Sequence, residues 1–132
     1  MKIEELSIGN WVLFKGAPFQ VENIMNNKLH LKRMSEYGFY IYFFIENNEG
    51  IEPFDISNMA LDKNGFRQID GIWRLYLDID EKFYIDVDID ERTIFISKNN
   101  RTLCYLESDD ELCLHQLQNI LTINNINKHF YV

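Results

Sequence analysis

Residues 73–90 read WRLYLDIDEKFYIDVDID, and this stretch decides the fold of the second half of the chain. Apolar side chains occupy every second position from Trp73 to Ile79 and again from Phe83 to Ile89. Because side chains on a strand point alternately to opposite faces, this period of two predicts two neighbouring strands with one buried face. The opposite face is expected to carry a cluster of carboxylates, contributed by Asp78, Asp80, Asp86, Asp88 and Asp90.

The first part of the chain is a series of short strand and turn signals. Strands are predicted, in chain order, at 11–15, 19–25, 28–34, 39–45 and 51–54. Asn26-Asn27 and the segment 47–50 are predicted turns, because asparagine and glycine tolerate positive φ. Short strands joined by tight turns are typical of small barrels. Residues 1–54 are therefore expected to form a lobe with an SH3-like barrel.

Residues 55–132 are expected to form a second lobe, either separate from the first or part of one compact unit with it. A short helix is predicted between Ser57, a good N-cap residue, and Gly65, a residue suited to follow a helix end. The strands of an antiparallel meander are predicted after it, at 66–69, 72–79, 83–89, 92–98 and 102–106.

The C-terminal segment predicts a helix and a last strand. Ser108 and Glu111 have the spacing of a capping box, and the apolar residues that follow recur on one face. An amphipathic helix is therefore expected from this box to about Ile123, and 126–132 is expected to add a final strand. The fold class predicted for the whole chain is α+β, mostly antiparallel β.

The charge of the protein is concentrated in one segment. The 132 residues carry a net charge of −8, and residues 78–91, with one lysine and seven acidic residues, carry −6 of it. An acidic protein repels nucleic-acid phosphates, so nucleic acid is not the expected partner. No signal peptide and no apolar run long enough to cross a membrane is present. Cys104 and Cys113 form no paired motif, which favours reduced thiols in a cytoplasm.

The aspartate cluster is the first candidate site. The interpretation given most weight is a solvated face that keeps the sheet soluble. A basic protein partner comes next, and a divalent cation last. The spacing of Asp86, Asp88 and Asp90 is that of the start of a calcium loop, but Glu91 stands where such a loop requires glycine. No metal and no cofactor is therefore predicted.

The aromatic strand is the second candidate site. Tyr40, Tyr42 and Phe44 are expected to project from the face opposite Ile41 and Phe43. Nucleic-acid bases could stack on such a platform, but no basic residue is interleaved with it. Burial between the two lobes, or at a homodimer contact, is the preferred interpretation.

No catalytic group of residues is recognised. His30, His115 and His129 lack the spacing of metal ligands, and His115 is expected on the solvated face of its helix. Neither cysteine lies in a motif that would activate a thiolate. An enzyme is therefore not predicted, although a site assembled between the lobes is kept as an alternative.

Several short motifs resemble those of one protein family. Residues 8–12 read IGNWV, Glu52-Pro53 and Gly65-Phe66 flank the predicted short helix, and residues 115–119 read HQLQN. In this order they are similar to a family of small uncharacterised proteins of Bacteroides-type gut bacteria and of their phages and mobile elements. The resemblance implies a bacterial cytoplasmic setting. It implies no activity and no site residues, and the aspartate cluster is not part of it.

Together these observations favour a non-enzymatic protein-interaction module. Its candidate partner-binding residues are those of the aspartate cluster and of the aromatic strand. The expected partner is another protein, basic if the aspartates bind it, or a second copy of the chain. The alternatives are a module that binds nucleic acid or mimics DNA, and, with least support, an enzyme.

Overall fold

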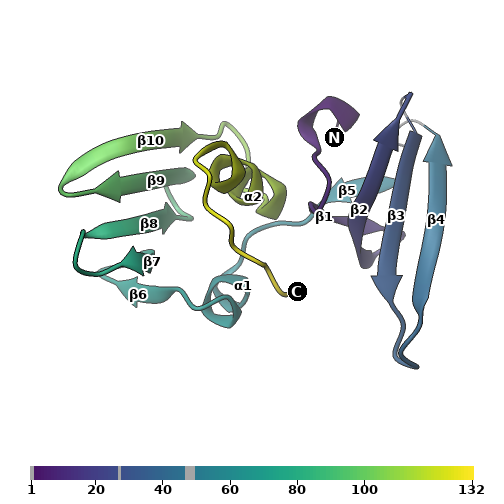
Figure 1. The fold of residues 1–132 in the computed structure, drawn as a ribbon, viewed down its shortest axis with the longest axis horizontal. Coiled ribbons are helices and arrows are strands. Elements are labelled where there is room, and N and C mark those ends of the chain that lie inside the picture. Colours follow the sequence, from purple (N-terminus) through teal and green to yellow (C-terminus); the bar gives the residue numbers. More distant parts are fainter. Residues whose placement is uncertain (1, 27, 47–49) are drawn as a thin grey trace. The chain divides into compact units, whose positions relative to one another are not determined.

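The computed structural model describes residues 2–26, 28–46 and 50–132. The chain divides into two compact units, Met1–Phe54 and Asp55–Val132, which are described separately below (Figure 1). Each unit contains one five-stranded sheet in which every strand pairing is antiparallel. With a helix near the C-terminus, the protein has the α+β fold that the sequence predicts.

Unit 1 begins with one turn of 3-10 helix, followed by a meander of four strands and a fifth strand that returns to pair with the first. Its elements are η1 (Ile3–Glu5), β1 (Trp11–Phe14), β2 (Ala17–Met25), β3 (Lys28–Met34), β4 (Tyr40–Glu46) and β5 (Ile51–Pro53). The strand order is β4-β3-β2-β1-β5. Each strand lies within two residues of its predicted position. Of the two predicted turns, Asn26 has a φ of +49°, whereas Asn27 and residues 47–49 lie outside the described residues.

The closed SH3-like barrel expected for residues 1–54 is not formed. In the described part of the chain the sheet is open, with β4 and β5 as its two edges. Only three residues of β5 pair with β1, and the strand ends at Pro53, which has no N–H to extend the ladder. The first strand of the unit thus pairs with the last, as in a small barrel, but β4 and β5 do not pair to close the sheet.

The core of unit 1 comes from alternate positions on its strands. The buried apolar residues are Leu6, Val12, Phe14, Phe19, Val21, Leu29, Leu31, Ile45 and Ile51. The ring of Phe43 lies 5.3 Å from that of Phe14 and 5.5 Å from that of Phe19, measured between centroids. The ring of Phe43 on β4 thus contacts core rings, which agrees with the predicted sorting of the aromatic strand, while the residue as a whole is 39% exposed.

Unit 2 is a second meander with two helices. Its elements are α1 (Asn58–Lys63), β6 (Arg67–Ile69), β7 (Ile72–Asp78), β8 (Phe83–Asp88), β9 (Thr93–Lys98), β10 (Arg101–Glu107) and α2 (Leu114–Ile123). The strand order is β10-β9-β8-β7-β6. As predicted, Ser57 caps α1, since its Oγ accepts from the N–H of Ala60 at 3.1 Å. Gly65 follows the helix with a φ of +89°, which a residue with a Cβ rarely adopts.

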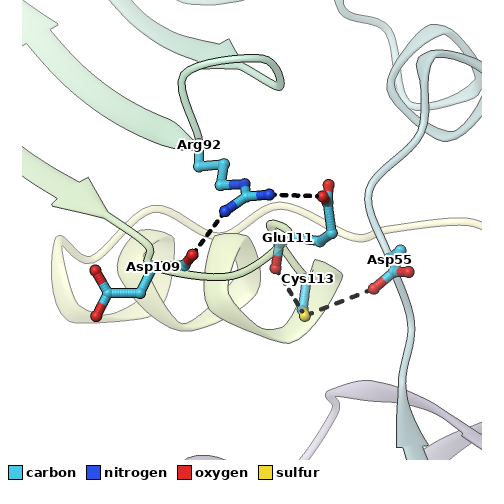
Figure 2. A network of polar contacts seen from close by, with 5 residues as sticks. All are labelled: Asp55, Arg92, Asp109, Glu111 and Cys113. Atoms are coloured by element: carbon cyan, nitrogen blue, oxygen red, sulfur yellow. Dashed lines mark hydrogen bonds and ion pairs between the residues drawn. The ribbon is translucent and has the colours of Figure 1, made fainter.

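The α2 helix begins at Leu114, so the capping box predicted at Ser108 and Glu111 is wrong. Arg92 binds this segment in the loop before the helix (Figure 2). Its Nη1 donates to the carbonyl oxygen of Asp109 at 2.6 Å, and its Nη2 donates to Oε1 of Glu111 at 3.0 Å. The Glu111 carboxylate therefore pairs with an arginine from the β8–β9 turn instead of capping a helix.

A second set of hydrogen bonds also keeps residues 112–113 outside the helix. The N–H of Ile56 donates to the carbonyl of Leu112, and Asp55 pairs with Cys113 in an antiparallel bridge. The side-chain oxygen of Gln116 accepts from the N–H of Cys113 at 2.9 Å. The backbone of residues 112–113 is thus used in pairing with 55–56 before the first helical turn forms.

The last residues of the chain form no strand, contrary to the prediction for 126–132. They instead run back toward α1 (Figure 1), and Asn64 at the end of that helix binds them. The Asn64 side chain accepts from the N–H of Tyr131 at 2.7 Å and donates to its carbonyl at 2.9 Å. It also donates to the carbonyl of Ala60 at 2.8 Å. Phe130, which precedes Tyr131 in the sequence, is buried. The Asn64 side chain therefore makes the hydrogen bonds to the Tyr131 backbone that a neighbouring strand would otherwise make.

Among the described residues, no helix has both the length and the apolar character needed to cross a membrane.

Replacing Asn64 with alanine should destabilise unit 2. The side chain is 3% exposed and makes three hydrogen bonds, and its loss would leave backbone groups of Tyr131 without these partners. At about 1 kcal/mol for each bond, we expect the free energy of unfolding to fall by about 2–3 kcal/mol in urea denaturation. The control Asn127→Ala changes an exposed asparagine and should alter it by less than about 0.5 kcal/mol. Equal effects would contradict the role of Asn64.

Candidate functional site

The aspartates of β8 project as the alternation predicts. Ile85 and Val87 are fully buried, while Asp86 and Asp88 alternate with them on the opposite face of the sheet. The alternation fails at the end of β7, because the strand pairing shifts register between Tyr76 and Asp78. Ile79, predicted to be buried, is 72% exposed in the turn that follows.

A duplicated turn accounts for the other aspartates. Residues 78–82 read DIDEK and residues 88–92 read DIDER. In each copy the first aspartate accepts, through Oδ1, from the N–H of the glutamate three residues later, at 3.3 Å and 3.1 Å. In each copy the final basic residue has a positive φ, +48° at Lys82 and +57° at Arg92. The aspartate that opens each copy is thus a structural part of the turn.

The two turns lie at opposite ends of β8, because one precedes that strand and the other follows it. Asp78 and Asp80 therefore lie at one end of the sheet, and Asp88 and Asp90 at the other. The single cluster of five carboxylates expected from the sequence is not present. Apolar and acidic residues continue to alternate in the sequence through both turns, although β7 ends at Asp78 and β8 ends at Asp88.

Asp86 lies on the sheet face but is paired. The Nε and Nη2 atoms of Arg74 donate to its two carboxylate oxygens at 2.7 Å and 2.9 Å, and its side chain is 15% exposed. The Arg74 guanidinium also stacks 3.8 Å from the ring centre of Tyr84. The hydrogen bond to Asp86 raises the pKa of Arg74 above its ordinary value. The carboxylate of Asp86 is thus engaged within the unit, in a pair that joins β7 to β8.

The aromatic residues of β4 are exposed. Tyr40 and Tyr42 are each 51% exposed and Phe44 is 71% exposed, whereas Ile45 on the other face is buried. The residues on β3 directly across from Tyr42, Phe44 and Glu46 are Lys32, His30 and Lys28. We call the surface made by Tyr40, Tyr42 and Phe44, with these three β3 residues, the aromatic face.

The basic residues of the aromatic face were not expected there. Read along β4 alone, the aromatic strand has no basic residue interleaved with it. The β3–β4 pairing supplies them from the neighbouring strand: the rings of His30 and Phe44 lie 4.5 Å apart, and Lys32 Nζ lies 5.2 Å from the ring centre of Tyr40. The sequence signal that could have located them is the short turn between the two predicted strands, at residues 35–38. In the structure the N–H of Ser35 donates to the carbonyl of Phe39, and this fixes the register of β3 with β4.

Both lysines of the aromatic face are neutralised by glutamates. Lys32 Nζ lies 2.8 Å from a carboxylate oxygen of Glu22, and Lys28 Nζ lies 3.3 Å from one of Glu46. The hydrogen bond that Lys32 donates to Glu22 raises the pKa of Lys32 above its ordinary value. The face therefore carries aromatic rings without a net positive charge.

The remaining candidate groups are dispersed. His115, predicted to be solvated, is 5% exposed. Leu114 and Leu117 are buried as well, so the first turn of α2 is enclosed on more than one side. Cys113 Sγ lies 3.4 Å from the carbonyl of Glu111 and 3.8 Å from Oδ1 of Asp55 (Figure 2). Within the described ranges, no group of three or more His, Cys, Asp or Glu side chains could hold a metal ion.

Comparisons with protein-family models, with curated proteins and with solved structures find no match to this chain. Its function is therefore inferred from its own geometry, in which the aromatic face is the most exposed concentration of rings on one strand.

The duplicated turn predicts different effects for two neighbouring aspartates. Asp88→Ala removes the acceptor for the Glu91 N–H and should lower the free energy of unfolding by about 1 kcal/mol. Asp90→Ala changes an exposed residue in the same turn and should alter it by less than about 0.5 kcal/mol. Thermal or urea unfolding measures both. A larger loss for Asp90→Ala would show that the turn depends on other contacts.

The Lys32–Glu22 pair predicts a dependence on alkaline pH. Because the folded pKa of Lys32 is raised above 10.5, the pair stabilises the protein fully below pH 10.5 and loses this effect as the pH rises through the folded pKa. An NMR titration of the Lys32 side chain should therefore give a midpoint above 10.5. In Glu22→Ala the midpoint should fall toward 10.5. An unchanged midpoint in this variant would exclude Glu22 as the cause.

Proposed function

We propose that this protein is a non-enzymatic protein-interaction module and that the aromatic face binds its partner. The observation that carries the proposal is the exposure of three alternate aromatic side chains on one edge strand, at 51%, 51% and 71% for Tyr40, Tyr42 and Phe44. Contiguous exposed apolar surface of this kind is characteristic of interaction sites. Tyrosine and phenylalanine are also enriched in the buried centres of protein interfaces.

The charges around the rings favour a protein over a nucleic acid as the partner. Surfaces that bind single strands combine stacking rings with cations that contact phosphates. Here Lys28 and Lys32 are each paired with a glutamate, and the whole chain has a net charge of −8. Stacking rings without available cations suit a protein surface, where burial of apolar area provides most of the binding energy.

Two further features belong to the proposal. We infer that unit 1 is an open, SH3-like module, because β1–β4 form a meander and β5 returns to pair with β1. A cytoplasmic setting is proposed because the two cysteines of the sequence, Cys104 and Cys113, form no paired motif.

The test removes the rings and compares the proteins captured. The variant Tyr42→Thr with Phe44→Thr keeps strand-forming residues while deleting two exposed rings, so the fold should be retained. Immobilised wild-type protein should capture a partner from a bacterial extract, and this variant should lose at least about 90% of it, since exposed aromatic residues dominate such interfaces.

The matched control is Tyr105→Thr, which deletes a ring 50% exposed on β10, an edge strand of the other sheet. It should leave capture unchanged. Equal capture by the wild type and the double variant, with both folded by circular dichroism, would remove the aromatic face from the function.

A further inference from the structure

The edge formed by β4 differs from the other three sheet edges of the described chain. It has seven residues, YIYFFIE, with no proline and one charged residue at its end. Exposed edges of this kind pair with other strands unless proline, lysine, a bulge or short length prevents it. β4 has none of these features.

The other edges are protected. β5 has three residues and ends at Pro53, and β6 has three residues and begins with Arg67. β10 is as long as β4, but it has charged residues at both ends and a register shift between Thr102 and Cys104. The protection of three edges makes the bare edge of β4 a specific feature of this chain.

The backbone of β4 presents a usable row of donors and acceptors. In an antiparallel pair, alternate residues exchange both backbone bonds with the partner strand, and those between them turn their N–H and C=O groups away. The Ser35 N–H donates to the Phe39 carbonyl at 2.7 Å, and the Ser35–Phe39 pair continues the register of Met34 with Tyr40. The residues that turn their backbone groups outward are therefore Tyr40, Tyr42, Phe44 and Glu46.

We propose, on the basis of the function above, that the partner of the aromatic face is a second copy of this chain, paired antiparallel along β4 and centred on Phe43. This register uses all seven residues of the strand. It places Tyr42 opposite Phe44 of the second copy and Tyr40 opposite Glu46 of the second copy, so outward-turned backbone groups meet outward-turned groups. On the inner face Ile41 lies opposite Ile45 of the second copy.

The pairing is self-complementary in charge as well as in register. No like charges lie opposite each other, because Glu46 meets a tyrosine and the two lysines of the aromatic face already pair within their own copy. Such a contact is isologous, the type that closes a twofold dimer. The two open sheets of unit 1 would join into one.

The area available indicates how strong the dimer is. An aromatic side chain buries roughly 150–250 Å², so the three residues, at 51%, 51% and 71% exposure, offer at most roughly 350 Å² per copy, of which edge pairing covers a part. The sum for two copies, roughly 700 Å², is below the roughly 1,200 Å² at which stable interfaces begin. The dimer is therefore reversible, with a dissociation constant of roughly micromolar or weaker.

Two double variants test the register with the same loss of aromatic area. In Tyr42→Glu with Phe44→Glu, the proposed pairing sets glutamates opposite glutamates. In Tyr42→Glu with Phe44→Lys, it sets each glutamate opposite a lysine of the second copy. Within its own copy, the glutamate at position 42 faces Lys32 in both variants. The two variants differ only at position 44, which faces His30 within its own copy and position 42 of the second copy in the proposed pairing.

Sedimentation velocity over a concentration series measures the result. Wild-type protein should shift from monomer to dimer as concentration rises, the like-charge variant should remain monomeric, and the opposite-charge variant should dimerise at least about tenfold more tightly than the like-charge one. Tyr105→Glu on β10 is the control and should dimerise as the wild type does. Circular dichroism confirms that each variant is folded.

The outcomes separate this inference from the proposed function. A wild type that stays monomeric to about 1 mM, or two double variants that associate equally, would overturn the β4 dimer. If the aromatic face still captured another protein in that case, the interaction module would stand with a different partner. Loss of both self-association and capture would reject both.

Discussion

The register between neighbouring strands is the constraint on which both units depend, and tight turns set it. Lys15-Gly16, Asp70-Gly71 and Asn99-Asn100 each place two residues at positive φ between paired strands. Such turns match the twist of a hairpin and allow one register only. A slip of one residue would move every buried side chain of the strand to the opposite face. Which side chains are buried in each unit thus depends on the backbone angles of a few turn residues.

Two other turns explain part of the acidic composition. Asp78 and Asp88 begin two copies of one five-residue turn, where a short carboxylate accepts a backbone N–H and the chain then passes through a residue at positive φ. Asp86 neutralises Arg74 on the outer side of the sheet. Asp78, Asp86 and Asp88, three of the seven acidic residues in 78–91, thus have structural roles in two successive hairpins. A shared acidic binding surface is not needed to account for them.

The aromatic face arises from a different consequence of pairing. β3 contributes Lys28, His30 and Lys32, and β4 contributes three rings, and neither strand shows the combined surface by itself. The lysines contact glutamates and hold their positions beside the rings without adding net charge. Because β4 is an edge, the rings and the outward backbone groups occupy the same border of the sheet. A partner strand can therefore use both.

The sequence by itself determined the strands of the two sheets, most turns and the buried face of β8, because a period of two is a local property that each strand expresses alone. Ile85 and Val87 could be placed in the interior, and Ser57 at the start of α1, without knowledge of any contact. Only the tertiary structure decided what depends on distant partners. Arg92 holds the segment before α2 outside the helix, and Asn64 binds the last residues. The β3–β4 register surrounds the rings with paired charges. Each of these contacts joins strands or loops whose approach is fixed by folding, so no local pattern in the chain could encode it.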